Sequence, residues 1–201
     1  MQRSLVGSEM CIRDRSQVRN EYGKSVHVDY EVSIYDYDGK RVSTFRGQPT
    51  TVQSGETVVL KASAPLKDLH FWSWGYGYLY DVKTTLLVNG RPVDEVVTRT
   101  GFRKTRFGEG KVWLNDRVLQ LKGYAQRSSN EWPGVGMSVP AWLSDYSNGL
   151  MVEDNANLVR WMHITPWKQD IESCDRVGLI QAMQALSLIH ISEPTRLRCI
   201  S

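Results

Sequence analysis

The side chains best suited to chemistry lie in the second half of this 201-residue chain. His163 follows an apolar stretch with the pattern of a strand, and Glu131 lies just beyond another such stretch. Either side chain could bind or protonate a ligand at a strand end, although a lone histidine is more often structural. Cys174 has no histidine beside it in sequence, and a nucleophilic thiolate needs an activating base or cation. We therefore interpret Cys174 as a helix-packing residue.

Tryptophan is the second residue type with a chemical use, and the chain holds seven. An indole ring can stack on the apolar face of a sugar, or it can fill a core or a gap between domains. Trp132, Trp161 and Trp167 lie near the candidate strand ends. Packing is favoured for each ring taken alone, and sugar stacking remains the alternative.

The two terminal peptides have a different character. "LVGSEMCIRD" near the start and "SLIHISEPTR" near the end can be encoded by opposite strands of one DNA duplex. That duplex resembles a sequencing-library adapter, and such scars are excluded from fold reasoning. We therefore predict that residues 1–15 and 186–201 are adapter-derived and that the native sequence runs from 16 to 185.

Without the flanks, which carry five arginines and three acids, the net charge falls from +3 to +1. Such a balance favours neither nucleic acid nor an anionic membrane as a partner. No apolar run reaches the length of a membrane span, so we expect no membrane insertion. Cys174 is then the only native cysteine, which excludes an internal disulfide. The sequence leaves the cellular location unknown.

The elements that must position these residues change type along the chain. In "SVHVDYEVSIYD" (25–36) apolar residues alternate on one face, which predicts a strand. Asn89-Gly90 predicts a hairpin turn between two further strands. At least five such strands without a helical pattern predict an antiparallel sandwich.

From about residue 118 the pattern becomes strand, helix, strand, helix, strand. Strands are predicted at Val118–Tyr124, Asn157–Ile164 and "LIQAM", with a partly helical segment at Val139–Asn157. The second helix is predicted to begin with Thr165 as N-cap and to end at Gly178. This alternation predicts a parallel sheet.

Three motifs carry a family resemblance. "GFRKTRFGEGKVWLNDRVLQLKGYA", "NANLVRWMHITPWKQDIESCDRVGLI" and the Trp-rich "FWSWGYGYLYDVKTTL" together resemble the β-galactosidase, β-glucuronidase and β-mannosidase group, glycoside hydrolase family 2. The resemblance implies an immunoglobulin-like β-sandwich at 16–107, followed at 108–185 by the truncated start of a (β/α)₈ TIM barrel. It also implies a retaining hydrolase of terminal β-linked sugars such as galactosides.

The same resemblance places both catalytic glutamates after later strands, so no catalytic residue is expected in this chain. A retaining glycosidase needs two carboxylates about 5 Å apart, so the chain alone is expected to be inactive. Six of the seven acids of the barrel portion fall on predicted helices or their flanks. No cofactor and no metal site are expected, and a longer parent could form oligomers.

Substrate contacts are the role that the resemblance implies for several residues. His163 and Arg160 match the family's Val-Arg and histidine positions, and "AQRSSNEW" stands where the family has Asn-Arg-His followed by an acid. That departure bears on which sugar is bound. The expected carbohydrate-binding residues are His163, Arg160, Arg127, Asn130, Glu131 and Trp161.

Two other functions remain open from the residues. The chain could be a non-catalytic sugar-binding or scaffolding sandwich, with Trp72, Trp74, Tyr76 and Tyr78 on one alternating strand face as its stacking surface. It could also be a structural linker domain, although that reading leaves Arg160 and His163 without a role. Coding sequence beyond residue 185 would separate the enzyme from the module.

Overall fold

The computed structural model describes residues 10–126, 132, 134–136, 138–162 and 165–183. These residues form two compact units. The first comprises residues up to 70 together with 80–100, and the second comprises 71–79 and the chain from 101 onward. The expected boundary at 107 and 108 stays a prediction.

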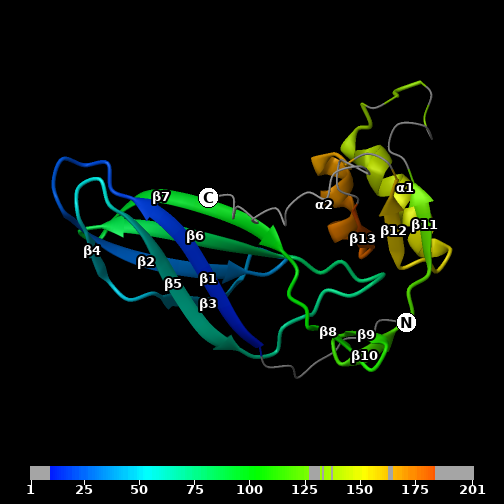
Figure 1. Cartoon of the computed structure of the whole chain (residues 1–201), viewed down its shortest axis with the longest axis horizontal. Helices are drawn as coiled ribbons and strands as arrows, with labels where there is room; N and C mark the ends of the chain where they lie inside the picture. The colour runs from blue at the N-terminus through cyan, green and yellow to red at the C-terminus, as the bar shows by residue number, and fades with distance from the viewer. Residues whose placement is uncertain (1–9, 127–131, 133, 137, 163–164, 184–201) are drawn as a thin grey trace. The chain divides into compact units, whose positions relative to one another are not determined.

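Antiparallel strands make up the first unit (Figure 1). One sheet has the order β3-β2-β6-β7, with β4 also pairing with β2, and a separate ribbon joins β1 to β5. The predicted sandwich-like sheets are confirmed. The strands are β1 (Met10–Arg19), β2 (Val26–Tyr35), β3 (Arg41–Arg46), β4 (Thr50–Val52), β5 (Thr57–Leu66), β6 (Tyr80–Val88) and β7 (Arg91–Thr100).

Strand β2 carries the core of this unit, as its alternating pattern predicts. Its inward residues Val26, Val28, Tyr30, Val32 and Ile34 are all less than 9% exposed. The β1-β5 ribbon covers this face, because side chains of β1 bond to the hydroxyl of Tyr30. The expected Asn89-Gly90 hairpin is also present, with both residues at positive φ and with Val88 paired to Arg91.

Residues 10–15, which the sequence analysis assigns to the adapter, form the first part of β1 and pair with β5. Asp14 in this segment accepts a hydrogen bond from the Tyr30 hydroxyl, which also bonds Ser16 Oγ at 2.8 Å. Burial, reinforced by the bond to Asp14, raises the pKa of Tyr30 to about 12. The adapter origin of these residues stays a prediction, and the contacts describe the chain as it stands.

This raised pKa predicts a loss of stability in alkali. The folded state holds the Tyr30 proton more tightly than the unfolded chain, whose tyrosine pKa is near 10. The stabilisation is therefore complete below about pH 10 and is lost as the pH rises through about 12, a change on the order of 2–3 kcal/mol. Urea unfolding of the wild type and of Tyr30→Phe across this range measures it. Parallel pH profiles for the two proteins would contradict the prediction.

The second unit contains two small sheets. Strands β8 (Thr105–Gly108), β9 (Lys111–Leu114) and β10 (Arg117–Leu119) form an antiparallel sheet. Strands β11 (Gly123–Gln126), β12 (Leu158–Trp161) and β13 (Ile180–Ala182) form a parallel one. Helix α1 (Ala141–Glu153) joins β11 to β12, and α2 (Lys168–Val177) joins β12 to β13. The predicted strand-helix alternation is thus present in the described residues.

The predicted strand Val118–Tyr124 is wrong, because it is split between β10 and β11. Asn157 explains the break. Its side chain accepts a hydrogen bond from the Lys122 backbone N–H and donates one to the Gln120 carbonyl, each at 2.8 Å. These side-chain bonds take the backbone groups of the intervening residues out of a continuous strand ladder.

The Trp-rich segment also differs from its prediction. Residues 71–79 form a loop with a single bridge between Ser73 and Tyr76, so its aromatic side chains do not alternate on a strand. Trp72 is 5% exposed and its indole N–H donates to the Asp175 carbonyl at 2.8 Å. The loop packs against the end of α2, where Gly178 accepts from the Gly75 N–H at 2.9 Å. A four-ring stacking face is therefore not present.

Helix α2 begins three residues after the predicted N-cap. Lys168 is its first residue, and Asp170 fixes this start by accepting the Trp167 backbone N–H at 3.1 Å. The predicted end is confirmed, since Gly178 adopts the left-handed conformation with φ 79°. Neither helix of the described chain is long and apolar enough to span a bilayer.

Candidate functional site

The candidate site lies at the carboxyl ends of the three parallel strands, where residues after strands of such sheets commonly bind ligands. Four of the expected binding residues, His163, Arg127, Asn130 and Glu131, lie outside the described residues. Their roles stay predictions. Arg160 and Trp161 are described, and they lie next to each other on the central strand β12.

Arg160 lies on the sheet face opposite the helices. Its register partners are Ala125 on β11 and Ala182 on β13, which are too small to cover it. Arg160 is accordingly exposed, while its neighbour Val159 on the helix side is fully buried. An exposed guanidinium between two alanines leaves its donors available to an anionic or hydroxyl-rich ligand.

Trp161 lies on the helix side and has the environment of a core residue. It is 1% exposed and packs with Val159, Cys174 and Leu179. Its indole N–H donates to Gln181 Oε1 at 3.1 Å. The ring is therefore held between the sheet and the helices, and its expected role in sugar binding stays a prediction.

The described acids of this unit lie on the helices or their flanks, as the sequence predicts. Asp145 pairs with Arg176 at 2.9 Å, and Asp154 accepts the Tyr124 hydroxyl at 3.0 Å. Burial raises the pKa of Asp175, with the nearby cations Arg103 and Arg176 opposing that effect. These contacts are structural, and no pair of described carboxylates is arranged for acid and nucleophile roles at a strand end.

Cys174 is fully buried, and this burial raises the pKa of its thiol well above the ordinary range. The neutral thiol that results is a poor nucleophile, which agrees with its predicted packing role. Within the described ranges, no group of three or more His, Cys, Asp or Glu side chains could hold a metal ion.

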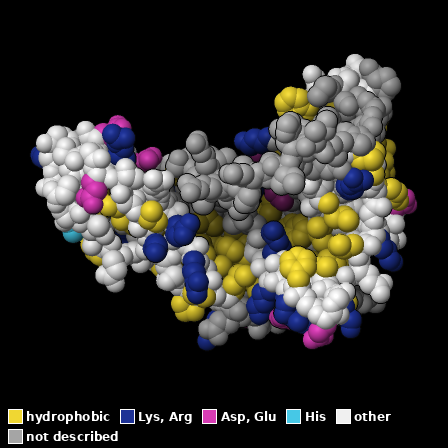
Figure 2. Space-filling view, in the orientation of Figure 1, with side chains coloured by type: hydrophobic (Ala, Val, Ile, Leu, Met, Phe, Trp, Pro, Cys, Tyr) yellow, Lys and Arg dark blue, Asp and Glu magenta, His cyan; other side chains and the backbone are white. Residues whose placement is uncertain are grey.

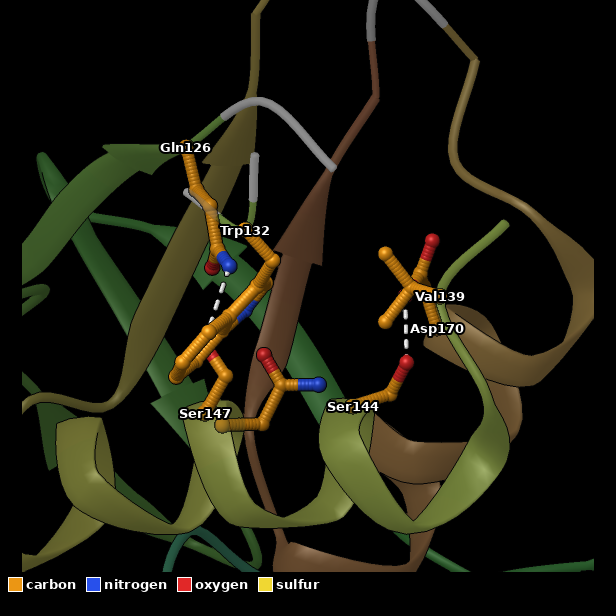
Figure 3. Close-up of a pocket in the computed structure, with 7 residues that line it drawn as sticks. Gln126, Trp132, Val139, Ser144, Ser147 and Asp170 are labelled. Carbon is orange, nitrogen blue, oxygen red and sulfur yellow. Dashed lines mark hydrogen bonds between the residues drawn. The ribbon is translucent and has the colours of Figure 1, made fainter. Parts of the chain in front are cut away.

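A small polar cavity lies behind the strand ends, between β11, α1 and α2 (Figure 3). Its volume is about 10 Å³, room for roughly one water-sized occupant. Figure 3 shows Gln126, Trp132 and Ser147 on one side of it and Ser144 and Asp170 on the other. Asn148 completes the polar lining.

Sequence reasoning did not select this set of residues. Ser144 and Asn148 are polar residues within a helix, where solvent exposure is the usual expectation, yet they are 3% and 1% exposed. The signal available in the sequence was their spacing: four residues separate Ser144 from Asn148, which places both on one face of α1.

Comparison with known proteins gives the family. Residues 10–103 match the sequence model of glycosyl hydrolases family 2. The chain is 24% identical over 173 residues to a β-glucuronidase of Formosa agariphila, covering 86% of this chain and 18% of that protein. It is 28% identical over 158 residues to a β-galactosidase of Thermoanaerobacterium thermosulfurigenes, covering 78% of this chain and 22% of that protein.

The fold agrees with these matches. A family 2 glycosyl hydrolase structure from Bacteroides cellulosilyticus superposes with a TM-score of 0.81 at 22% identity, covering 91% of this chain and 25% of that one. An antiparallel sandwich followed by a small β/α unit thus recurs among glycosidases. The chain belongs to glycosyl hydrolase family 2. It spans between 18% and 25% of the length of these three relatives.

Proposed function

We propose that this chain is part of a retaining β-glycosidase whose substrate is a terminal β-linked sugar such as a galactoside. In this proposal β11, α1, β12, α2 and β13 are the start of a (β/α)₈ barrel, and the catalytic glutamates follow later strands. The observation that supports it most is the parallel β-α-β-α-β unit, which comes directly after the sandwich in a chain of this family. The relatives named as β-glucuronidase and β-galactosidase supply the substrate class.

The surface of α1 is consistent with a larger domain. Hydrophobic side chains reach the surface at many places in Figure 2. On α1, Trp142, Tyr146 and Leu150 are 68%, 54% and 44% exposed, and their four-residue spacing makes one apolar stripe. In a closed barrel, further helices would cover such a stripe.

Under this proposal Arg160 faces the barrel interior, where its positive charge would hold a sugar hydroxyl or stabilise a catalytic carboxylate. His163, Arg127, Asn130 and Glu131 would contact the sugar from the loops after β11 and β12. The sugar-binding module is the weaker candidate, because the buried ring of Trp72 removes the surface that it requires.

The test compares this chain with its parent. We expect the purified 201-residue chain to release no nitrophenol from 4-nitrophenyl β-galactoside, β-glucuronide or β-mannoside above the buffer rate, since it lacks the second carboxylate that the mechanism needs. We expect the parent reading frame to continue through a full barrel and to hydrolyse one of the three. Hydrolysis by the chain alone would refute the missing-glutamate argument, and a parent that ends shortly after residue 185 would refute the barrel.

A further inference from the structure

The cavity between β11, α1 and α2 has an unusual balance of hydrogen-bonding groups. Gln126 and Asn148 both line it, and they are 8% and 1% exposed. Their amide nitrogens are already used: Gln126 Nε2 donates to Ser147 Oγ at 3.1 Å, and Asn148 Nδ2 donates to Ser173 Oγ at 3.0 Å. The amide oxygens of both residues are buried and receive no hydrogen bond among the described residues. Two acceptors are thus left without a donor, which is costly for buried groups.

A carboxylate adds negative charge to the same cavity. Asp170 is 3% exposed and accepts bonds from the Ser144 hydroxyl at 2.7 Å and from the Trp167 N–H at 3.1 Å. No lysine or arginine lines the cavity, and within the described chain Asp170 forms no ion pair. The cavity therefore presents one buried negative charge and two unpaired carbonyl oxygens.

We propose that this cavity binds one small monovalent cation of the Na⁺ or K⁺ class. Hard cations prefer carboxylate, amide and hydroxyl oxygens, and those are the polar atoms found here. One carboxylate balances a single positive charge, whereas Ca²⁺ sites usually gather several carboxylates and six to eight oxygens. The cation would satisfy Gln126 Oε1 and Asn148 Oδ1 and would tie the end of β11 to both helices.

Thermal unfolding in different salts tests this proposal on the full chain. We compare NaCl, KCl and choline chloride at equal ionic strength, because choline is too large for the cavity. Binding to the folded state raises the midpoint in NaCl or KCl by about 3–5 °C at saturation, and the rise follows the ligand concentration. Equal midpoints in all three salts would overturn the proposal and leave a water molecule as the occupant.

Variants locate the effect. Gln126→Met removes one of the unpaired oxygens at nearly constant volume and should abolish the difference between the salts. Glu172→Gln is the matched control: it removes a partly exposed acid on α2 that pairs with Lys168, away from the cavity lining, so the difference should persist. An unreactive Cys174 thiol verifies that each variant is folded. A salt effect that survives in Gln126→Met would place the cation elsewhere and refute this site.

Crystals soaked in Tl⁺, which replaces K⁺ and scatters anomalously, give a direct answer. An anomalous peak between Gln126, Asn148 and Asp170 supports the site. Absence of a peak there, in crystals that diffract well enough to show the side chains, overturns it.

Discussion

Gly77→Ala is expected to cost about 3 kcal/mol or more of the unfolding free energy of the second unit. A Cβ at this position would lie 2.0 Å from the carbonyl oxygen of Arg176 and 2.6 Å from that of Asp175. Both neighbours are backbone atoms at the end of α2, so no side-chain rotation can relieve the clash. The loop would have to move away from the helix, and the bond from the Trp72 indole to Asp175 would be lost with it.

Urea unfolding followed by tryptophan fluorescence measures this loss. Gly149→Ala is the matched control, because Gly149 lies within α1 and nothing approaches its Cβ position within 4 Å. Replacing a helical glycine by alanine should stabilise by roughly 0.5–1 kcal/mol. The two substitutions are chemically identical, so equal unfolding midpoints would contradict the packing of the Trp-rich loop against α2.

Trp161→Ala is the second change with a large expected effect. Removing a ring that is 1% exposed should cost about 3–5 kcal/mol, since the cavity left among Val159, Cys174 and Leu179 can collapse only in part. Trp161→Phe keeps most of the packing but leaves Gln181 Oε1 without its indole donor, so a smaller loss of about 1–3 kcal/mol is expected.

Trp142→Ala provides the reference for a surface tryptophan. Trp142 is 68% exposed, and its removal should change stability by no more than about 0.5 kcal/mol. Thiol labelling gives an independent measure, because Cys174 should react faster with Ellman's reagent in Trp161→Ala as local opening becomes more frequent. Near-native stability of Trp161→Ala combined with lost sugar binding would instead support the stacking role that the sequence suggests.

Local patterns were sufficient for much of the fold. The alternation of Val26 to Ile34 predicts both a strand and its buried face, because successive side chains of a strand point to opposite sides. Asn89-Gly90 predicts its hairpin because both residues tolerate positive φ. The positions of the described acids on helices also follow from periodicity alone, since each depends on contacts only a few residues apart.

Long-range contacts decided what the patterns did not. Asn157 interrupts the expected strand by bonding to residues 35 and 37 positions earlier in the chain. Trp72 is buried because α2, about a hundred residues later, accepts its N–H. An alternating aromatic run is compatible with a strand, so its sequence contains no sign of this distant partner.

The sequence by itself determined the family resemblance, the order of strands and helices, and the residues expected near a sugar, since these depend on motifs and local periodicity. Only the tertiary structure decided that Trp161 faces the core, that Arg160 faces outward, and that Gln126, Asn148 and Asp170 share one cavity. The physical reason is that burial and charge balance depend on which elements meet in space. A glutamine at a strand end and an asparagine in a helix are ordinary polar residues until packing excludes water from both.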